Sequence, residues 1–121
     1  MPKTILIVED DLANMRLITD LLEAQGYDTI QSVDGKDTLQ LATEFRPDLI
    51  IMDIQLPEVS GIDHTKALKA DEALKHIPVV AVTAFAKKSD EEKIREAGCD
   101  GYITKPVNIP LLLETVAKFL S

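Results

Sequence analysis

Acids, one hydroxyl and one lysine stand directly after short apolar runs in this sequence. These side chains are Glu9, Asp10, Asp11, Asp53, Thr83 and Lys105. Carboxylates placed a few ångströms apart repel one another by about 4 kcal/mol per pair at an intermediate effective dielectric. A hard divalent cation removes that repulsion, and oxygen-only ligation with room for water favours Mg²⁺. If the fold gathers these side chains, they predict a magnesium site.

Asp53 has the setting of a nucleophile. Phosphoryl transfer needs cations around the phosphoryl oxygens, hydrogen-bond donors beside them and a nucleophile in line. A carboxylate can be that nucleophile and form an acyl phosphate. Asp53 ends the apolar run "LIIM", which aims it rigidly, and Lys105 and Thr83 supply a cation and a donor. We therefore predict that Asp53 is a phosphoryl acceptor.

Predicted strands and helices alternate along the whole chain. Strands are expected at 4–8, 27–33, 49–53, 78–83 and 101–104. Helices are expected at 11–26, 34–46, 60–70, 89–98 and 108–120. This alternation predicts one doubly wound α/β domain with a five-stranded parallel sheet and five helices on both faces. The carboxyl ends of parallel strands meet at one edge, where such folds bind ligands, so the six side chains above should converge.

Several local features set the expected boundaries. In the first helix one apolar face is predicted, formed by Leu12, Met15, Ile18, Leu21 and Leu22. The second helix is expected to open at Asp34 and to carry Leu39, Ala42 and Phe45. Ser60, Ser89 with Glu92, and Asn108 with Pro110 have the spacing of helix starts. Asp11 has a second interpretation, because a carboxylate there can simply cap the first helix.

Composition limits the partners. The 121 residues carry 13 basic and 21 acidic side chains, a net charge of -8, which opposes binding to nucleic acids and to anionic membranes. One cysteine, Cys99, and no signal peptide fit a reducing, cytoplasmic location, and Cys99 is expected to be a small buried residue. His64 and His76 are expected at the surface. A protein partner or a cation is the expected ligand.

Four segments resemble a known family. In order and spacing, "ILIVED", "LIIMDIQLPEVSG", "VVAVTA" and "YITKP" are similar to the signature segments of the receiver domain of two-component response regulators. The likeness covers the whole chain and implies the flavodoxin-like strand order 2-1-3-4-5. Among receivers, the sequence looks most like the DivK group, which are single-domain regulators of the bacterial cell cycle.

The resemblance implies a ligand set for Mg²⁺. Asp10 and Asp53 would bind the ion through their side chains, and the main-chain carbonyl of Gln55 would supply another oxygen. Glu9 would act largely through metal-bound water, since many relatives carry the shorter Asp at that position.

It also implies the reaction and the switch. Asp53 would accept a phosphoryl group from a histidine kinase or phosphotransferase, Lys105 would pair with the phosphoryl oxygens, and Thr83 would donate a hydrogen bond to one of them. Thr83 would move inward and Tyr102 would fill the vacated space, which changes the surface of the fourth helix, fifth strand and fifth helix. The Lys105–Pro106 bond would be cis.

The expected protein is a stand-alone receiver spanning 1–121, a monomer or weak dimer without an output domain, that assists its own phosphorylation but is no conventional enzyme. Two alternatives stay open. An aspartyl-phosphate hydrolase would need a second acid where Gln55 stands. A receiver-like module that works without phosphorylation would be expected to lack the acids or Lys105.

Three residues also have plainer interpretations. Thr83 and Tyr102 can simply be core residues. Phe85 can either pack within its loop or form part of a docking patch.

Overall fold

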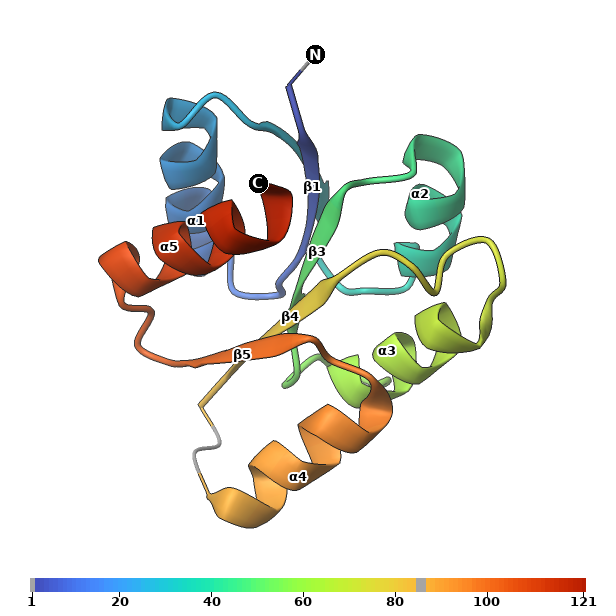
Figure 1. The fold of residues 1–121 in the computed structure, drawn as a ribbon. Helices are drawn as coiled ribbons and strands as arrows, with labels where there is room; N and C mark the ends of the chain where they lie inside the picture. Colours follow the sequence, from blue (N-terminus) through green and yellow to red (C-terminus); the bar gives the residue numbers. More distant parts are fainter. Residues whose placement is uncertain (1, 85–86) are drawn as a thin grey trace.

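A five-stranded parallel sheet runs through the centre of the molecule, with helices on both sides (Figure 1). The computed structural model describes residues 2–84 and 87–121. The strands are β1 (Thr4–Val8), β2 (Asp28–Ser32), β3 (Leu49–Asp53), β4 (Val79–Thr83) and β5 (Gly101–Thr104). The helices are α1 (Leu12–Ala24), α2 (Thr38–Phe45), α3 (Gly61–Ala70), α4 (Lys88–Ala97) and α5 (Ile109–Leu120). The strand order β2-β1-β3-β4-β5 confirms the predicted topology.

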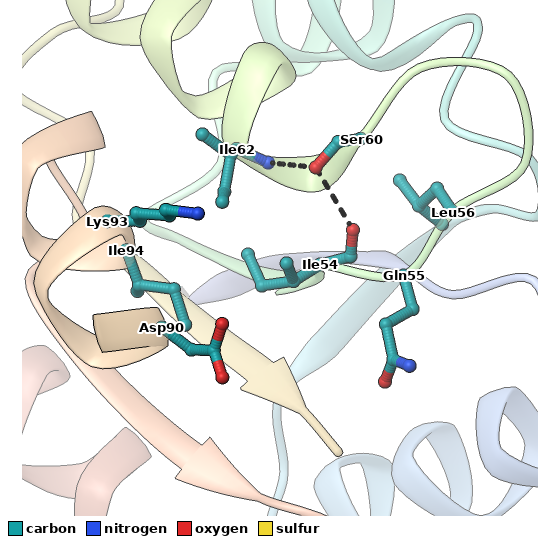
Figure 2. A pocket seen from close by; sticks show the side chains of 8 residues that line it. All are labelled: Ile54, Gln55, Leu56, Ser60, Ile62, Asp90, Lys93 and Ile94. Carbon is teal, nitrogen blue, oxygen red and sulfur yellow. Dashed lines mark hydrogen bonds between the residues drawn. The ribbon is translucent and has the colours of Figure 1, made fainter. Parts of the chain in front are cut away.

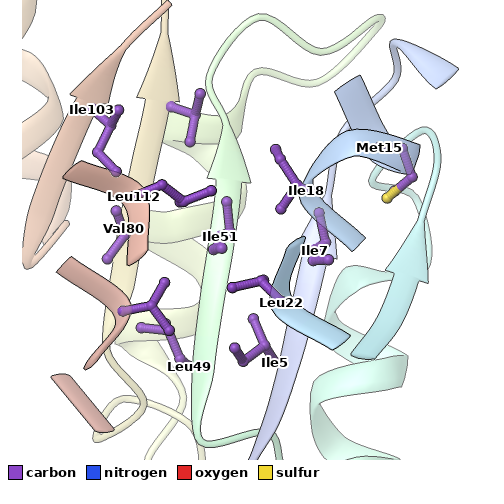
Figure 3. Packing of buried hydrophobic residues seen from close by; sticks show 12 residues of the cluster. Ile5, Ile7, Met15, Ile18, Leu22, Leu49, Ile51, Val80, Ile103 and Leu112 are labelled. Carbon is purple, nitrogen blue, oxygen red and sulfur yellow. The ribbon is translucent and has the colours of Figure 1, made fainter. Parts of the chain in front are cut away.

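The sheet buries both of its faces. Along β3, Leu49 and Ile51 pack with α1 and α5, whereas Ile50 and Met52 pack with α2, α3 and α4. Figure 3 shows the first of these layers, in which Leu22 of α1 and Leu112 of α5 lie over the strand side chains. Successive side chains of a strand point to opposite faces, so a strand covered on both sides must be apolar at every position. This explains why the strand runs of the sequence do not alternate with polar residues.

Three predicted helix starts are confirmed. Asp11 accepts a hydrogen bond from the Asn14 N–H at 3.1 Å, so it caps α1 as its second interpretation proposed. The Ser60 hydroxyl accepts from the Ile62 N–H at 3.1 Å and begins α3. The side chain of Asn108 caps α5 in the same way, with Pro110 in the first turn.

The predicted start of the second helix was wrong. α2 begins at Thr38, and Asp34 lies in the loop before it. Gly35 has a φ of +81°, outside the helical region, and its carbonyl accepts from both the N–H and the hydroxyl of Thr38. This turn delays the helix. All three apolar residues expected on this helix lie in α2, where Ala42 is buried and Leu39 and Phe45 are exposed.

Two predictions at other helix starts were also wrong. Leu12 was expected in the buried face of α1, yet it is 69% exposed because it lies in the first turn, past the carboxyl ends of the strands. The predicted capping box of Ser89 and Glu92 does not form, because α4 begins at Lys88 and Ser89 already lies inside the helix. Lys87, in extended conformation, precedes that helix instead.

The isolated histidines and the cysteine differ in their surroundings. His76 is exposed, as predicted, but His64 is partly buried, with its Nε2 atom under the surface against Gly35, and burial lowers the pKa of the imidazole. Cys99 is partly buried, and its Sγ lies 3.7 Å from the Thr65 hydroxyl. Burial raises the pKa of the Cys99 thiol, which agrees with a packing role.

Two leucines of α1 provide a matched test of the burial pattern. Leu22 is fully buried against the sheet and Leu12 is exposed. Leu22→Ala should lower the free energy of unfolding by about 2–5 kcal/mol, because it leaves a cavity in the core. Leu12→Ala should change it by less than about 0.5 kcal/mol. Urea unfolding of both variants checks this, and equal costs would contradict the described orientation of α1.

Candidate functional site

Strand register brings two of the predicted carboxylates together. β1 and β3 are neighbours in which Ile7 lies opposite Ile51. Two residues further along each strand direction are Glu9 and Asp53, which therefore face the same side of the sheet at the same level. Each residue is 1% exposed. The strand alternation that buries Ile7 and Ile51 therefore also places Glu9 and Asp53 side by side, at the carboxyl ends of β1 and β3.

Asp10 and Lys105 complete a compact cluster. One carboxylate oxygen from each of Glu9, Asp10 and Asp53 lies within 4.8 Å of the others. The Lys105 ammonium lies 3.2 Å from Glu9 Oε1 and 3.3 Å from Asp53 Oδ2. The Lys105–Pro106 bond is cis, as predicted. The structure therefore brings together four of the predicted site residues, which come from the ends of β1, β3 and β5.

The chain around Asp53 holds its carboxylate in place. The Gln55 N–H donates to Asp53 Oδ1 at 3.0 Å. The loop then returns to β3, where the Gly61 N–H and the Ser60 hydroxyl both donate to the Ile54 carbonyl, at 3.0 and 3.3 Å. A Cβ at Gly61 would lie 2.2 Å from the Asp53 carbonyl oxygen, so a glycine is required there. Sequence reasoning gave Gly61 no role, although its place in "PEVSG" was visible.

The acids perturb one another strongly. Burial and the hydrogen bond with Asp53 raise the pKa of Glu9 to about 7. Burial raises the pKa of Asp10 as well, and the closeness of Asp53 adds to it. Burial alone would raise the pKa of Asp53, but its hydrogen bonds and the charge of Lys105 prevail and lower it. At neutral pH Asp53 is thus ionised, while Glu9 is near its midpoint.

The pKa of Lys105 is raised, although burial by itself would lower it. Desolvation would lower the pKa of this ammonium, but the charges of Asp53 and Glu9 outweigh it and raise the pKa. The side chain is 19% exposed, and it stays charged. One fixed positive charge therefore faces three carboxyl groups, which leaves an excess of negative charge.

The cluster fits a magnesium ion. All its candidate ligands are carboxylate oxygens, the donor type that Mg²⁺ prefers. Glu9 Oε1 is buried and makes no hydrogen bond within the described residues, although Lys105 is near. A buried carboxylate oxygen that shares a single ammonium with a second carboxylate, within an excess of negative charge, is a place where a cation or its bound water would be stabilised. Asp11, in contrast, is turned away into its cap.

Thr83 and Tyr102 lie on the other face of the sheet. Thr83 is fully buried at the end of β4, and strand alternation places it with Ala81 on the side of α4. Tyr102 lies opposite Ala81 on β5 and packs against the same apolar layer. The two side chains are thus diagonal neighbours on adjacent strands, while Asp53 faces α1 and α5. Phe85, a predicted loop or docking residue, lies outside the described residues.

A cleft of about 430 Å³ opens beside the cluster, between the loop after β3 and α4 (Figure 2). Ile54 and Ile62 contribute apolar walls, and Asp90 and Lys93 of α4 lie at its rim. None of the three carboxylates lines the cleft, and Asp53 faces the opposite side of β3.

Within residues 2–84 and 87–121, none of the helices has the length and apolar character of a membrane-spanning segment.

Comparison with known sequences gives a consistent result. Residues 5–117 match the family described as the response regulator receiver domain. The chain is 58% identical over 120 residues to the polar-differentiation response regulator DivK of Brucella anthropi, covering 99% of this chain and 98% of that protein. The DivK protein of Brucella ovis gives the same identity and coverage.

Solved structures agree with the fold. A putative response regulator from Chloroflexus aurantiacus is similar with a TM-score of 0.94 at 29% identity, covering 99% of this chain and 98% of that one. The chemotaxis protein CheY4 of Vibrio cholerae gives 0.92 at 25% identity, covering 98% and 99%. The receiver domain of a sensor histidine kinase from Pseudomonas aeruginosa gives 0.90 at 31% identity, covering 98% of each, and its structure has a magnesium ion coordinated in the active-site cleft.

The raised pKa of Glu9 makes the stability of the metal-free protein depend on pH. The folded-state pKa of about 7 lies above the ordinary value of 4.5, so the protonated form is favoured by folding and that stabilisation is lost as pH rises through 7. Glu9→Gln cannot ionise. In EDTA its free energy of unfolding should match the wild type near pH 4 and exceed it by roughly 3 kcal/mol at pH 8.5.

The control is Glu114→Gln, on the exposed side of α5, which should follow the wild type at every pH. Wild-type and Glu9→Gln curves that run parallel from pH 5 to 8.5 would contradict the described burial of Glu9 beside Asp53.

Proposed function

The chain belongs to the receiver domain family of response regulators, in two-component signalling, and from that premise we propose that Asp53 accepts a phosphoryl group. The observation that carries this proposal is the pairing of an ionised, oriented carboxylate with the Lys105 ammonium at 3.3 Å. Receivers act with histidine kinases or phosphotransferases and with downstream proteins, and we propose a phosphohistidine as the donor. An Asp53 oxygen would form the new P–O bond while the P–N bond of the donor breaks.

Asp53 is suited to act as the nucleophile. Its lowered pKa keeps the carboxylate ionised, so no general base is needed. The Gln55 N–H holds one carboxylate oxygen and Lys105 the other, so the carboxylate plane is fixed before the donor arrives. Such fixed orientation reduces the entropic cost of reaching the transition state.

Lys105 has two tasks in this proposal. Before transfer its ammonium compensates the charges of Asp53 and Glu9, as the two ion-pair distances indicate. After transfer the phosphoryl oxygens carry negative charge near the same atom, and the ammonium can bind one of them. The raised pKa of Lys105 ensures that this charge is present throughout the physiological range.

Mg²⁺, when bound, would neutralise the remaining carboxylate charge and stabilise the charge on the phosphoryl oxygens. We propose that Asp10 and Asp53 bind it by side-chain oxygens and Gln55 by its main-chain carbonyl. Glu9 would act largely through metal-bound water. The support comes from the cluster of three carboxylates and from the buried Glu9 Oε1, which shares the Lys105 ammonium with Asp53.

The proposed output is a change in a protein-binding surface. A phosphoryl group on Asp53 would draw in the hydroxyl of Thr83, and Tyr102 would take up the space released on the α4 face. The diagonal placement of these two residues supports the coupling. The affected surface is that of α4, β5 and α5, and a net charge of -8 favours a protein partner over DNA.

The location, cellular role and oligomeric state that we propose are based on the similar proteins. We propose a cytoplasmic regulator with a DivK-like role, acting as a monomer or weak dimer over the domain 1–121. It would assist its own phosphorylation and dephosphorylation without turning over a separate substrate. The support is the 58% identity to the DivK proteins along nearly the whole chain.

Acetyl phosphate tests the acceptor directly. With Mg²⁺ the wild type should gain one phosphoryl mass, because Asp53 displaces acetate from phosphorus. Asp53→Asn should gain none, since the amide is a poor nucleophile, and EDTA should abolish the gain in the wild type. Intact-mass spectrometry measures each result.

The control is Asp20→Asn, which alters an exposed aspartate of α1 and should leave the gain unchanged. A wild type that stays unmodified, or an Asp53→Asn variant modified as fully as the wild type, would refute the proposal.

A further inference from the structure

The side chain of Gln55 joins the phosphoacceptor loop to the end of β4. Its Oε1 atom accepts a hydrogen bond from the Ala84 N–H at 2.9 Å. The backbone N–H of Gln55 donates to Asp53 Oδ1 at 3.0 Å. Gln55 is among the residues that line the cleft, and Figure 2 shows its carboxamide directed away from Ser60 and Ile62. One residue therefore touches the acceptor with its backbone and the chain beyond Thr83 with its side chain.

The peptide group between Thr83 and Ala84 is held at both ends. Its carbonyl, that of Thr83, accepts from the Lys105 N–H at 2.7 Å. Its N–H, that of Ala84, donates to the Gln55 side chain. Because a peptide group is planar, these two bonds fix its orientation. The group can turn its N–H to another acceptor if the bond to Gln55 breaks.

A phosphoryl group on Asp53 would be such an acceptor. It adds anionic oxygens within a few bonds of Gln55, whose side chain already reaches Ala84. A hydrogen bond to an ionised oxygen is roughly twice as strong as one to a neutral amide oxygen. The exposed carboxamide of Gln55 is the weaker competitor for the single N–H of Ala84.

We infer that the Gln55 side chain is a latch: its hydrogen bond to Ala84 N–H holds the Thr83–Ala84 peptide in its resting orientation and opposes phosphorylation of Asp53. The inference rests on the proposed function and adds a residue that tunes it. Gln55 is a positioning residue in this role, because its side chain acts through the Ala84 peptide. Loss of the latch should favour the phosphorylated state by about two- to tenfold, the contribution typical of one neutral hydrogen bond.

Gln55→Met tests the latch, because it keeps the length of the side chain and the main-chain carbonyl but has no amide acceptor. In the resting, metal-free protein, hydrogen exchange of the Ala84 amide measured by NMR should be faster in Gln55→Met than in the wild type. Gln55→Glu restores an acceptor and should restore slow exchange. These readouts need no phosphoryl group.

Beryllofluoride with Mg²⁺ provides the second readout, since it binds carboxylates as a phosphoryl mimic. Gln55→Met should bind it about two- to tenfold more tightly than the wild type. The matched control is Gln31→Met on β2, away from the cluster. It deletes the 2.9 Å hydrogen bond that the Gln31 side chain donates to the Thr19 hydroxyl on α1. Its beryllofluoride affinity and its Ala84 exchange should equal those of the wild type.

The outcomes separate the latch from the function on which it rests. Unchanged Ala84 exchange in Gln55→Met, or a beryllofluoride affinity equal to that of the wild type, would overturn the latch alone. A wild type that neither binds beryllofluoride nor takes up a phosphoryl group would overturn the proposed function, and the regulatory role of Gln55 with it.

Discussion

Repulsion among carboxylates at one sheet edge is the constraint around which the site is organised. Glu9, Asp10 and Asp53 offer oxygens within 4.8 Å of one another, and two of these residues are almost inaccessible to water. Unit charges at such distances repel by roughly 4 kcal/mol per pair at an intermediate effective dielectric. Lys105 compensates a part of this, and proton uptake by Glu9 compensates another. A cluster that is unfavourable without a cation is one that binds a cation readily.

The rigid part of this arrangement could be predicted from the sequence. Asp53 ends a strand, and Glu9 and Lys105 each follow one, so the parallel sheet brings them together at its carboxyl edge whatever the loops do. The alternation of buried residues then decides the face, which is why Glu9 and Asp53 share one. Ser60 and Asn108 were predicted as caps because a capping side chain bonds within its own turn.

What could not be predicted depends on contacts between loops. The need for glycine at 61 arises from the path of the loop after β3, which returns to the Asp53 carbonyl. The bond from Ala84 to Gln55 joins residues 29 positions apart and has no local pattern. The late start of α2 follows from the turn at Gly35, and the exposure of Leu12 follows from where the strands end. Helical periodicity carries no information on either.

The residues of the proposed switch lie on opposite faces of the sheet. Asp53 faces α1 and α5, whereas Thr83 and Tyr102 lie against the layer under α4. A change at Asp53 must therefore pass around the end of β4 to reach the α4 surface. The Thr83–Ala84 peptide stands at this point, bonded on one side to Lys105 and on the other to Gln55. In the proposed switch, its two hydrogen bonds would give a charge change at Asp53 a route to the α4 surface.

Proton release on magnesium binding tests most directly whether charge compensation governs this site. Titration calorimetry in buffers of different ionisation enthalpy measures both the binding and the protons displaced. With the pKa of Glu9 at about 7, Mg²⁺ binding at pH 7 should release about half a proton, and at pH 8.5 almost none. Magnesium that binds at pH 7 without releasing protons, or does not bind at all, would contradict the account.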